Sequence, residues 1–269
     1  MRQISGLEGL TKMKPRNLPL IIGHRGASSE APENTLESFR LAWDQGADGI
    51  EADFRLSADE RIVCMHDATT GRTTGGDLNI AATTLKVLRR LDAGLWKGEV
   101  WAGAMIPTLD EVLAALPHGS RLFIEIKSGA EIIAPLERVL QASGLSPERI
   151  RLLSFSAPLI AALKQRLPDW HACWLCDYRH TLLTNVWSPS KEKVLDTLLR
   201  SGADGLASAD HSFLDLDLAD TLRGLGMEIH VWTVDRLPAA QRLCKLGVDS
   251  IMTNRPGWLR RRLTEQPAL

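Results

Sequence analysis

The sequence predicts a (β/α)8 TIM barrel with a small insertion after the second strand and its hairpin. Its 269 residues suit one large α/β barrel or two smaller domains. Short apolar strands alternate with amphipathic helical patterns along most of the chain. A Gly-Ala-Asp or Gly-Val-Asp joint recurs in "QGADGIE", "SGADGLA" and "LGVDSIM", where a helix ends before a strand. A doubly wound open sheet is the alternative, but "GHRGASSE" is not the G-x-G-x-x-G turn that such a sheet usually carries.

Eight segments have the length and composition of barrel strands, and seven helical patterns lie between them. The expected strands are residues 18–24, 48–56, 121–127, 149–155, 170–176, 203–208, 228–234 and 248–254. The expected helices are residues 34–46, 108–117, 130–144, 157–167, 191–202, 216–226 and 237–247. In "PENTLE", Asn34 and Glu37 predict a helix N-cap with a near capping box, and Glu33 could also face a site.

Residues 57–107 are too long and irregular for one helix. "ADE" joins the second strand to "RIVCMHD", which is typical of a hairpin return. The Thr- and Gly-rich stretch from about 67 to 107 is then expected to form an insertion over the mouth of the barrel, since long loops in compact domains are often lids. We expect residues 1–17 to be an N-terminal extension and residues 18–269 to form a single domain.

Composition gives few indications of a partner. The formal net charge of −1 does not favour nucleic acid. No signal-peptide pattern and no apolar run of about 18 residues are apparent, so no membrane span is expected. "CWLC" has a zinc-like spacing, but positions three apart on a strand face opposite sides and no second C-x-x-C follows. We therefore expect four reduced cysteines and a cytoplasmic protein; the oligomeric state is not indicated.

Charged residues alternate with apolar ones on two neighbouring strands. In "GIEADF", Glu51 and Asp53 share one face, and in "RLFIEIK" Glu125 and Lys127 share one face. The apolar positions suit the helix layer, so the charged positions should face the barrel interior. Ion pairing with Lys127 and Arg55 is the alternative, but one lysine does not balance three carboxylates in a poorly hydrated space. The pattern favours a hard divalent cation, Mg²⁺ or Ca²⁺.

Two histidines stand where strands end. His24 ends the first strand and is followed by Arg25, whose guanidinium could pair with a phosphate oxygen. His66 ends the hairpin return beside Asp67. Near one cation, two histidines could serve as general acid and general base. Trp232, in "HVWTVD", either lines the pocket or fills the core.

The motifs "HRGASSEAPENT", "GIEADF", "VCMHD", "RTT", "IPTLDEVL", "FIEIK", "LLSF", "HVWTVD" and "GVDSIMTNRP" occur in this order over residues 19–259. The chain thereby resembles the glycerophosphodiester phosphodiesterases. The resemblance implies a (β/α)8 barrel and metal-dependent hydrolysis of glycerophosphodiesters to sn-glycerol 3-phosphate and an alcohol. It implies metal ligands Glu51, Asp53 and Glu125, an acid/base pair His24 and His66, phosphate contacts from Arg25 and Lys127, and a glycerol pocket lined by Trp232.

The resemblance also indicates which cation to expect and shows one position at which this chain differs from the family. Intracellular members usually use Mg²⁺, which makes Mg²⁺ the expected cofactor ahead of Ca²⁺. The family commonly has Asn where this chain has Asp235, a change that could alter a loop hydrogen bond. A choline-binding cage would need Trp96, Trp101 and Trp232 together.

Two other functions compete with the phosphodiesterase. The inward Lys127 would suit a Schiff-base aldolase, but nearby carboxylates should raise its pKa and keep it protonated. A headgroup-binding module would use the same pocket without turnover. The headgroup alcohol itself is not indicated by the sequence.

Overall fold

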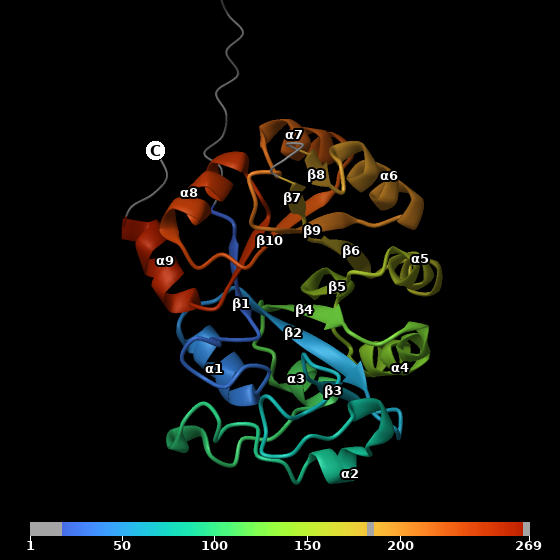
Figure 1. Cartoon of the computed structure of the whole chain (residues 1–269), viewed down its shortest axis with the longest axis vertical. Helices are drawn as coiled ribbons and strands as arrows, with labels where there is room; N and C mark the ends of the chain where they lie inside the picture. Colours follow the sequence, from blue (N-terminus) through green and yellow to red (C-terminus); the bar gives the residue numbers. More distant parts are fainter. Residues whose placement is uncertain (1–17, 182–185, 266–269) are drawn as a thin grey trace, which may run out of the picture.

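Eight parallel strands form the centre of the molecule (Figure 1). The computed structural model describes residues 18–181 and 186–265, so the expected extension at residues 1–17 lies outside the described part. The strands are β1 (Leu20–His24), β2 (Gly49–Leu56), β4 (Arg121–Ile126), β5 (Ile150–Ser154), β6 (His171–Cys176), β9 (Gly205–Ala209), β10 (Glu228–Trp232) and β11 (Ser250–Thr253). Because β1 pairs with both β11 and β2, the sheet closes on itself. The predicted barrel is confirmed; seven of the expected segments contain one of these strands, and β9 extends one residue beyond the expected segment 203–208.

Helices surround the strands on the outside (Figure 1). They are α1 (Leu36–Asp44), α3 (Leu109–Ala115), α4 (Ile133–Ser143), α5 (Ala157–Arg166), α6 (Lys191–Ser201), α7 (Leu216–Gly224), α8 (Leu237–Leu246) and α9 (Pro256–Glu265). The sequence did not predict α9, because arginines dominate its "WLRRRL" segment. Its Leu259 and Leu263, four residues apart, are nevertheless buried, and α9 packs against α8 and β1.

The strands separate two apolar layers, as alternation along a barrel strand requires. Ile50, Ala52 and Phe54 pack in the outer layer between strands and helices. Phe123 belongs instead to a small cluster inside the barrel, together with Ile22 and Met252. The predicted assignment of inward and outward positions on β2 and β4 is therefore correct.

The segment after β2 returns as a hairpin. β3 (Ile62–Cys64) pairs antiparallel with β2, with Phe54 opposite Cys64. The insertion that follows contains two 3₁₀ turns and the short helix α2 (Leu85–Leu88). It has its own apolar cluster, which includes Met65, Ile80 and Ile106. In Figure 1 the insertion lies beside β3, at the lower edge of the view.

Three further observations complete the description of the fold. A second hairpin, β7 (Arg179–Thr181) with β8 (Val186–Ser188), follows β6 and was not predicted. Cys64, Cys173, Cys176 and Cys244 are all free, as expected. Among the described residues, no helix combines the length and the apolar character needed to cross a membrane.

The start of α1 corrects one prediction. Its N-cap is Thr35, which forms a capping box with Ser38, and not Asn34. Asn34 has a φ of 59°, a left-handed conformation that Asn tolerates better than most residues. Its side chain is buried and points to β2. This position makes Asn34 part of the site described next.

Candidate active site

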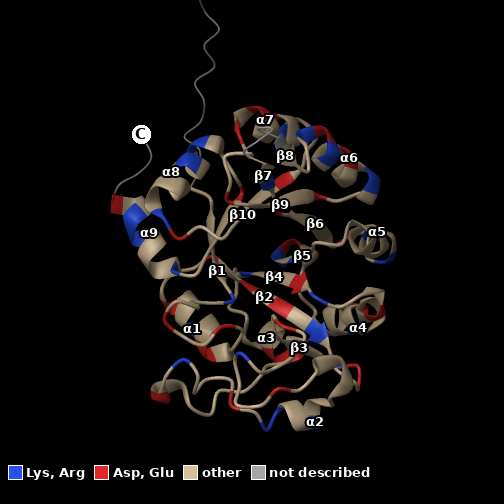
Figure 2. Ribbon diagram, in the orientation of Figure 1, with Lys and Arg blue, Asp and Glu red and all other residues tan. Residues whose placement is uncertain are grey.

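Three carboxylates meet inside the barrel near the carboxyl ends of β2 and β4. Asp53 lies opposite Glu125 in the strand register, and Glu51 lies two residues earlier on the same face of β2. Oxygen atoms of Glu51, Asp53 and Glu125 lie within 4.8 Å of one another, and all three residues are buried. Figure 2 shows the acidic residues of β2 within the ring of strands. The structure thus brings together the three predicted metal-ligand candidates.

Two cationic side chains lie against this acidic cluster. Arg25 Nε lies 3.0 Å from Asp53 Oδ2, and the backbone N–H of Arg25 donates to Glu51 Oε2 over 3.0 Å. Lys127 Nζ lies 3.1 Å from Asp53 Oδ1 and also contacts Glu125 Oε1. Arg55 instead donates to the backbone carbonyl of His66. The ion-pairing alternative is therefore realised in part, through Arg25 and Lys127, while Arg55 takes no part in it.

The carboxylates remain incompletely compensated. Burial and the neighbouring Asp53 raise the pKa of both Glu51 and Glu125 to about 8. Burial also raises the pKa of Asp53, but Lys127 and Arg25 outweigh it and lower the value to about 2. Glu51 Oε1 is buried and accepts no hydrogen bond from any residue that the structure describes. This group of oxygens fits a hard divalent cation, which would replace protons on the two glutamates.

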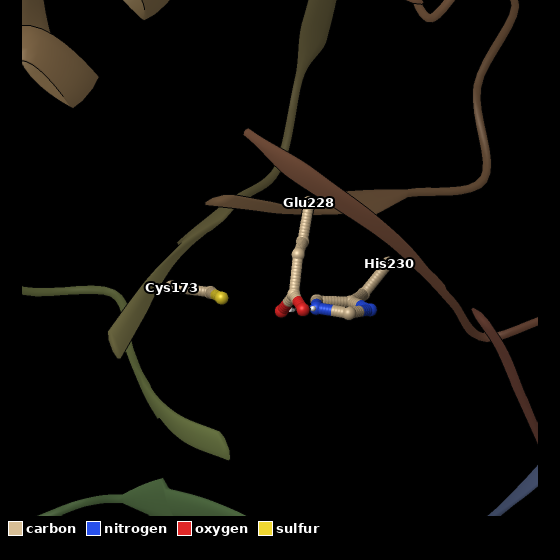
Figure 3. Close-up of side chains that lie close together, drawn as sticks. All are labelled: Cys173, Glu228 and His230. Carbon is tan, nitrogen blue, oxygen red and sulfur yellow. Dashed lines mark hydrogen bonds and ion pairs between the residues drawn. The ribbon is translucent and has the colours of Figure 1, made fainter. Parts of the chain in front are cut away.

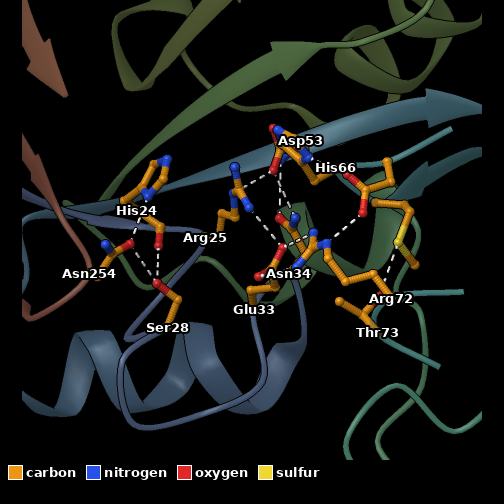
Figure 4. Close-up of polar contacts among 12 residues, drawn as sticks. His24, Arg25, Ser28, Glu33, Asn34, Asp53, His66, Arg72, Thr73 and Asn254 are labelled. Carbon is orange, nitrogen blue, oxygen red and sulfur yellow. Dashed lines mark hydrogen bonds and ion pairs between the residues drawn. The ribbon is translucent and has the colours of Figure 1, made fainter. Parts of the chain in front are cut away.

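His24 and His66 both line the cavity above the carboxylates. His24 Nε2 lies 3.9 Å from Glu51 Oε2, and its Nδ1 lies 2.8 Å from Asn254 Oδ1 (Figure 4). Burial and the adjacent Arg25 lower the pKa of His24. His66 Nδ1 lies 2.7 Å from Asp67 Oδ1, and burial lowers the pKa of His66. Each ring therefore has one nitrogen held by a neighbouring side chain.

The cavity has a volume of about 160 Å³ and two different sides. Arg25 and Lys127 lie on its charged side with the glutamates. Trp232, Phe155 and several aliphatic side chains form the apolar side, where the Phe155 and Trp232 rings pack edge to face at 5.6 Å. Trp96 and Trp101 do not line this cavity, so they form no aromatic cage with Trp232 there.

Asn34, Arg72 and Asn254 were not predicted as site residues, whereas Glu33 was expected as a residue that could face the site. Asn34 Nδ2 donates to Asp53 Oδ2 over 2.8 Å. Glu33 accepts from Arg25 Nη1 and from both terminal nitrogens of Arg72, which also donates to Asp67 (Figure 4). Asn254 holds His24. The motifs "PENT", "RTT" and "MTNRP" contain these residues, but no local pattern indicates which partner each side chain contacts.

A second group of potential ligands lies at the opposite end of the barrel and includes Cys173, Glu228 and His230 (Figure 3). Arg151 donates to both Glu228 carboxylate oxygens, at 2.6 and 2.7 Å. His230 Nε2 lies 3.2 Å from Glu228 Oε2, and burial raises the pKa of the Cys173 thiol well above its usual range. A guanidinium already compensates this carboxylate, so the cluster is a structural ion pair.

Comparison with known proteins agrees with this geometry. Residues 24–258 match the model of the glycerophosphoryl diester phosphodiesterase family. A glycerophosphodiester phosphodiesterase of Caldanaerobacter subterraneus is 33% identical over 241 residues, which cover 88% of this chain and 94% of the relative. A putative glycerophosphodiester phosphodiesterase of Bacillus subtilis is also 33% identical over 241 residues, which cover 89% of this chain and 96% of the relative.

Solved structures have the same architecture. A phosphodiesterase of Oleispira antarctica, determined in complex with the product sn-glycerol-3-phosphate, is 28% identical with a TM-score of 0.80, and the match covers 92% of this chain and 97% of that one. A glycerophosphodiester phosphodiesterase of Agrobacterium tumefaciens is 27% identical with a TM-score of 0.77, and the match covers 91% of this chain and all of that one (100%).

Proposed function

The chain belongs to the glycerophosphoryl diester phosphodiesterase family, and from this premise we propose that it hydrolyses glycerophosphodiesters to sn-glycerol 3-phosphate and an alcohol. One observation carries the proposal: three carboxylates, two histidines and two cationic side chains meet at one cavity with an apolar wall. The relative that holds sn-glycerol-3-phosphate supports the identity of the product.

Glu51, Asp53 and Glu125 would hold one divalent cation, Mg²⁺ ahead of Ca²⁺. Three carboxylates leave room for substrate oxygens and water around Mg²⁺, which prefers six oxygen ligands, whereas Ca²⁺ takes six to eight. The unpartnered Glu51 Oε1 and the raised pKa values of Glu51 and Glu125 support this assignment. When bound, the cation supplies Lewis-acid polarisation of a phosphoryl oxygen.

Arg25 and Lys127 are placed to contact the other phosphoryl oxygens, because both line the cavity. One of His24 and His66 removes a proton from the nucleophile and the other protonates the leaving alkoxide. The nucleophile is either water or the 2-hydroxyl of the substrate. Trp232 packs against the glycerol carbons and excludes water from that side of the cavity.

The two competing functions make different demands on the site. A Schiff-base aldolase needs an unprotonated Lys127. Burial lowers the pKa of this ammonium, but Asp53 and Glu125 outweigh it and raise the pKa, which disfavours that reaction. A headgroup-binding module needs no acid/base pair, whereas two histidines line this cavity.

The test is a coupled glycerol 3-phosphate assay on glycerophosphocholine, -ethanolamine, -inositol and -glycerol. Assays with EDTA, Mg²⁺ or Ca²⁺ separate the cation requirement from the headgroup preference. We expect turnover that EDTA abolishes and Mg²⁺ restores, and loss of turnover in His24→Ala and His66→Ala. His118→Ala, on an exposed loop, is the matched control. Stoichiometric binding of a headgroup without released glycerol phosphate would instead identify a binding module.

A further inference from the structure

Asp235 lies in the loop after β10 and accepts hydrogen bonds from Thr253 and Asn254, at the end of β11. Its Oδ1 accepts from Thr253 Oγ1 over 2.7 Å and from the backbone N–H of Asn254 over 2.8 Å. Its Oδ2 accepts from Asn254 Nδ2 over 2.6 Å. The carboxylate is therefore fixed at both oxygens and does not itself enter the cavity.

This arrangement determines the orientation of the Asn254 amide. An ionised Asp can only accept hydrogen bonds, so the nitrogen of the amide must face Asp235. The opposite orientation would place an amide oxygen 2.6 Å from Asp235 Oδ2, where two acceptors repel each other. Asn254 Oδ1 consequently faces His24 Nδ1, at 2.8 Å, and Ser28 Oγ, at 2.9 Å.

The amide orientation in turn determines the tautomer of His24. A carbonyl oxygen cannot donate, so neutral His24 must carry its proton on Nδ1. The unprotonated nitrogen is then Nε2, which lies on the Glu51 side, 3.9 Å from Oε2. Ser28 agrees with this orientation, because its hydroxyl can donate its proton to Asn254 Oδ1 over 2.9 Å.

We propose that Asp235 is a positioning residue for the reaction: through Asn254 it holds His24 in the Nδ1–H tautomer, which presents Nε2 to the cavity as a proton acceptor. In this tautomer His24 is equipped to be the general base of the pair. This inference rests on the proposed function for its catalytic consequence, but its statement about the tautomer does not depend on turnover.

Substitution of Asp235 by asparagine reverses the direction of the hydrogen bonds that run from His24 through Asn254 to residue 235. The new side chain can keep its oxygen toward Thr253 and the backbone of Asn254, and it then offers an N–H to the Asn254 amide. That amide must turn to accept it, and its nitrogen would face His24 Nδ1. The ring would shift to the Nε2–H tautomer, and the cavity would lose its acceptor.

The direct test is the ¹⁵N spectrum of the histidine rings at a pH where His24 is neutral, with His24→Gln used to assign the signals. We expect a protonated Nδ1 and an unprotonated Nε2 in the wild-type protein, and the reverse in Asp235→Asn. The His230 signals serve as an internal control, because that ring contacts Ser250 and Glu228 at the other end of the barrel. A wild-type Nε2–H tautomer, or a His24 tautomer unchanged by Asp235→Asn, would overturn the proposal.

Kinetics test the catalytic consequence separately. Asp235→Asn should lower kcat by about tenfold or more, as loss of an orienting partner does at comparable sites, with KM changed by less than about twofold. The reciprocal double variant Asp235→Asn with Asn254→Asp again places an acceptor-only group against His24 Nδ1, so it should restore the Nδ1–H tautomer and most of kcat. A double variant as impaired as the single one, or a wild-type kcat in Asp235→Asn, would contradict the positioning role. If the wild-type protein hydrolyses no diester, the proposed function fails and the ring spectrum still decides the tautomer.

Discussion

Asn34 and Asp53 are joined by two hydrogen bonds: Asn34 Nδ2 donates to Asp53 Oδ2 over 2.8 Å, and the backbone N–H of Asp53 donates to Asn34 Oδ1 over 3.1 Å. Asn34 Oδ1 also accepts from the Cys64 thiol at 3.2 Å. One side chain therefore connects the loop after β1 to β2 and β3. It also fixes the direction in which the Asp53 carboxylate points.

Asn34→Asp should damage both the site and the fold. The substitution keeps the size of the side chain and its tolerance of a left-handed backbone, but it turns a donor toward Asp53 Oδ2 into a carboxylate oxygen. We expect the free energy of unfolding to fall by about 1–3 kcal/mol and kcat/KM to fall by about 10- to 100-fold. Urea unfolding and the glycerol 3-phosphate assay measure the two effects. Asn79→Asp, at an exposed position in the insertion, is the matched control; equal behaviour of the two variants would refute the role given to Asn34.

Arg72 should act on the reaction through His66. It donates from Nε to Asp67 Oδ2 over 2.5 Å, and Asp67 Oδ1 holds His66 Nδ1 at 2.7 Å. It also donates to Glu33, so it joins the insertion to the loop after β1. We expect Arg72→Leu to lower kcat by about tenfold in an otherwise wild-type protein, with partial recovery in Arg72→Lys.

A double-mutant cycle with His66→Ala isolates this effect. If Arg72 works by orienting His66, then Arg72→Leu should cost almost nothing once the imidazole is gone. Fully additive losses in kcat would show that Arg72 acts elsewhere. Arg61→Leu is the control, because the Arg61 side chain forms an exposed ion pair with Asp110 at 3.6 Å.

The sequence was sufficient for the features that depend on periodicity. Alternation in "GIEADF" and "FIEIK" places Glu51, Asp53 and Glu125 inside the barrel, because the side chains of a strand must alternate between its faces. The eight strand segments follow from the same rule. What periodicity cannot predict is the partner of a loop side chain. Asn34 reads locally as a helix cap, and only the packing of its loop on β2 shows that it bonds to Asp53.

The polar contacts around the histidines could not be predicted from the sequence, for the same reason. Asn254 is 230 residues from His24 in sequence, and closure of the barrel between β1 and β11 is what brings them together. The insertion was predicted as a segment that lies over the mouth of the barrel, but the sequence does not show which of its residues contact the site. Its chain packs on its own cluster and reaches the site through Arg72, while Trp96 and Trp101 stay away from the cavity.

Cation binding should stabilise the folded protein measurably. A ligand at 100 times its Kd contributes about 2.7 kcal/mol, which corresponds to an increase in Tm of about 5–10 °C for a domain of this size. We expect this shift with Mg²⁺ after treatment with EDTA, and its loss in Glu51→Gln, which removes one of the three proposed carboxylate ligands. Differential scanning calorimetry provides the measurement. Glu60→Gln, in an exposed ion pair with Arg138, should keep the full shift. An undiminished shift in Glu51→Gln would place the cation elsewhere.

The ion pair at the other end of the barrel should make stability depend on pH. Burial raises the pKa of Glu228, but hydrogen bonds from His230 and Arg151 outweigh it and lower the pKa far below its usual 4.5. A carboxylate whose pKa is lower in the folded than in the unfolded protein stabilises the fold. This contribution is fully present when the pH is above the pKa of the unfolded state, and it is lost as the pH falls below about 4.5.

Glu228→Gln should therefore cost about 3 kcal/mol near neutral pH, the lower end of the range for a broken buried pair, because the Glu228 side chain is 22% exposed and Arg151 only 4%. The deficit should shrink as the pH falls below about 4.5, since Glu228 then binds a proton in the unfolded wild-type protein and stability is lost, whereas the variant has no carboxyl at this position to titrate. Urea unfolding of both proteins at a series of acid pH values measures the difference. Glu99→Gln, at an exposed position, should follow the wild-type curve. A constant gap between Glu228→Gln and wild type across this pH range would mean that Glu228 does not titrate with folding.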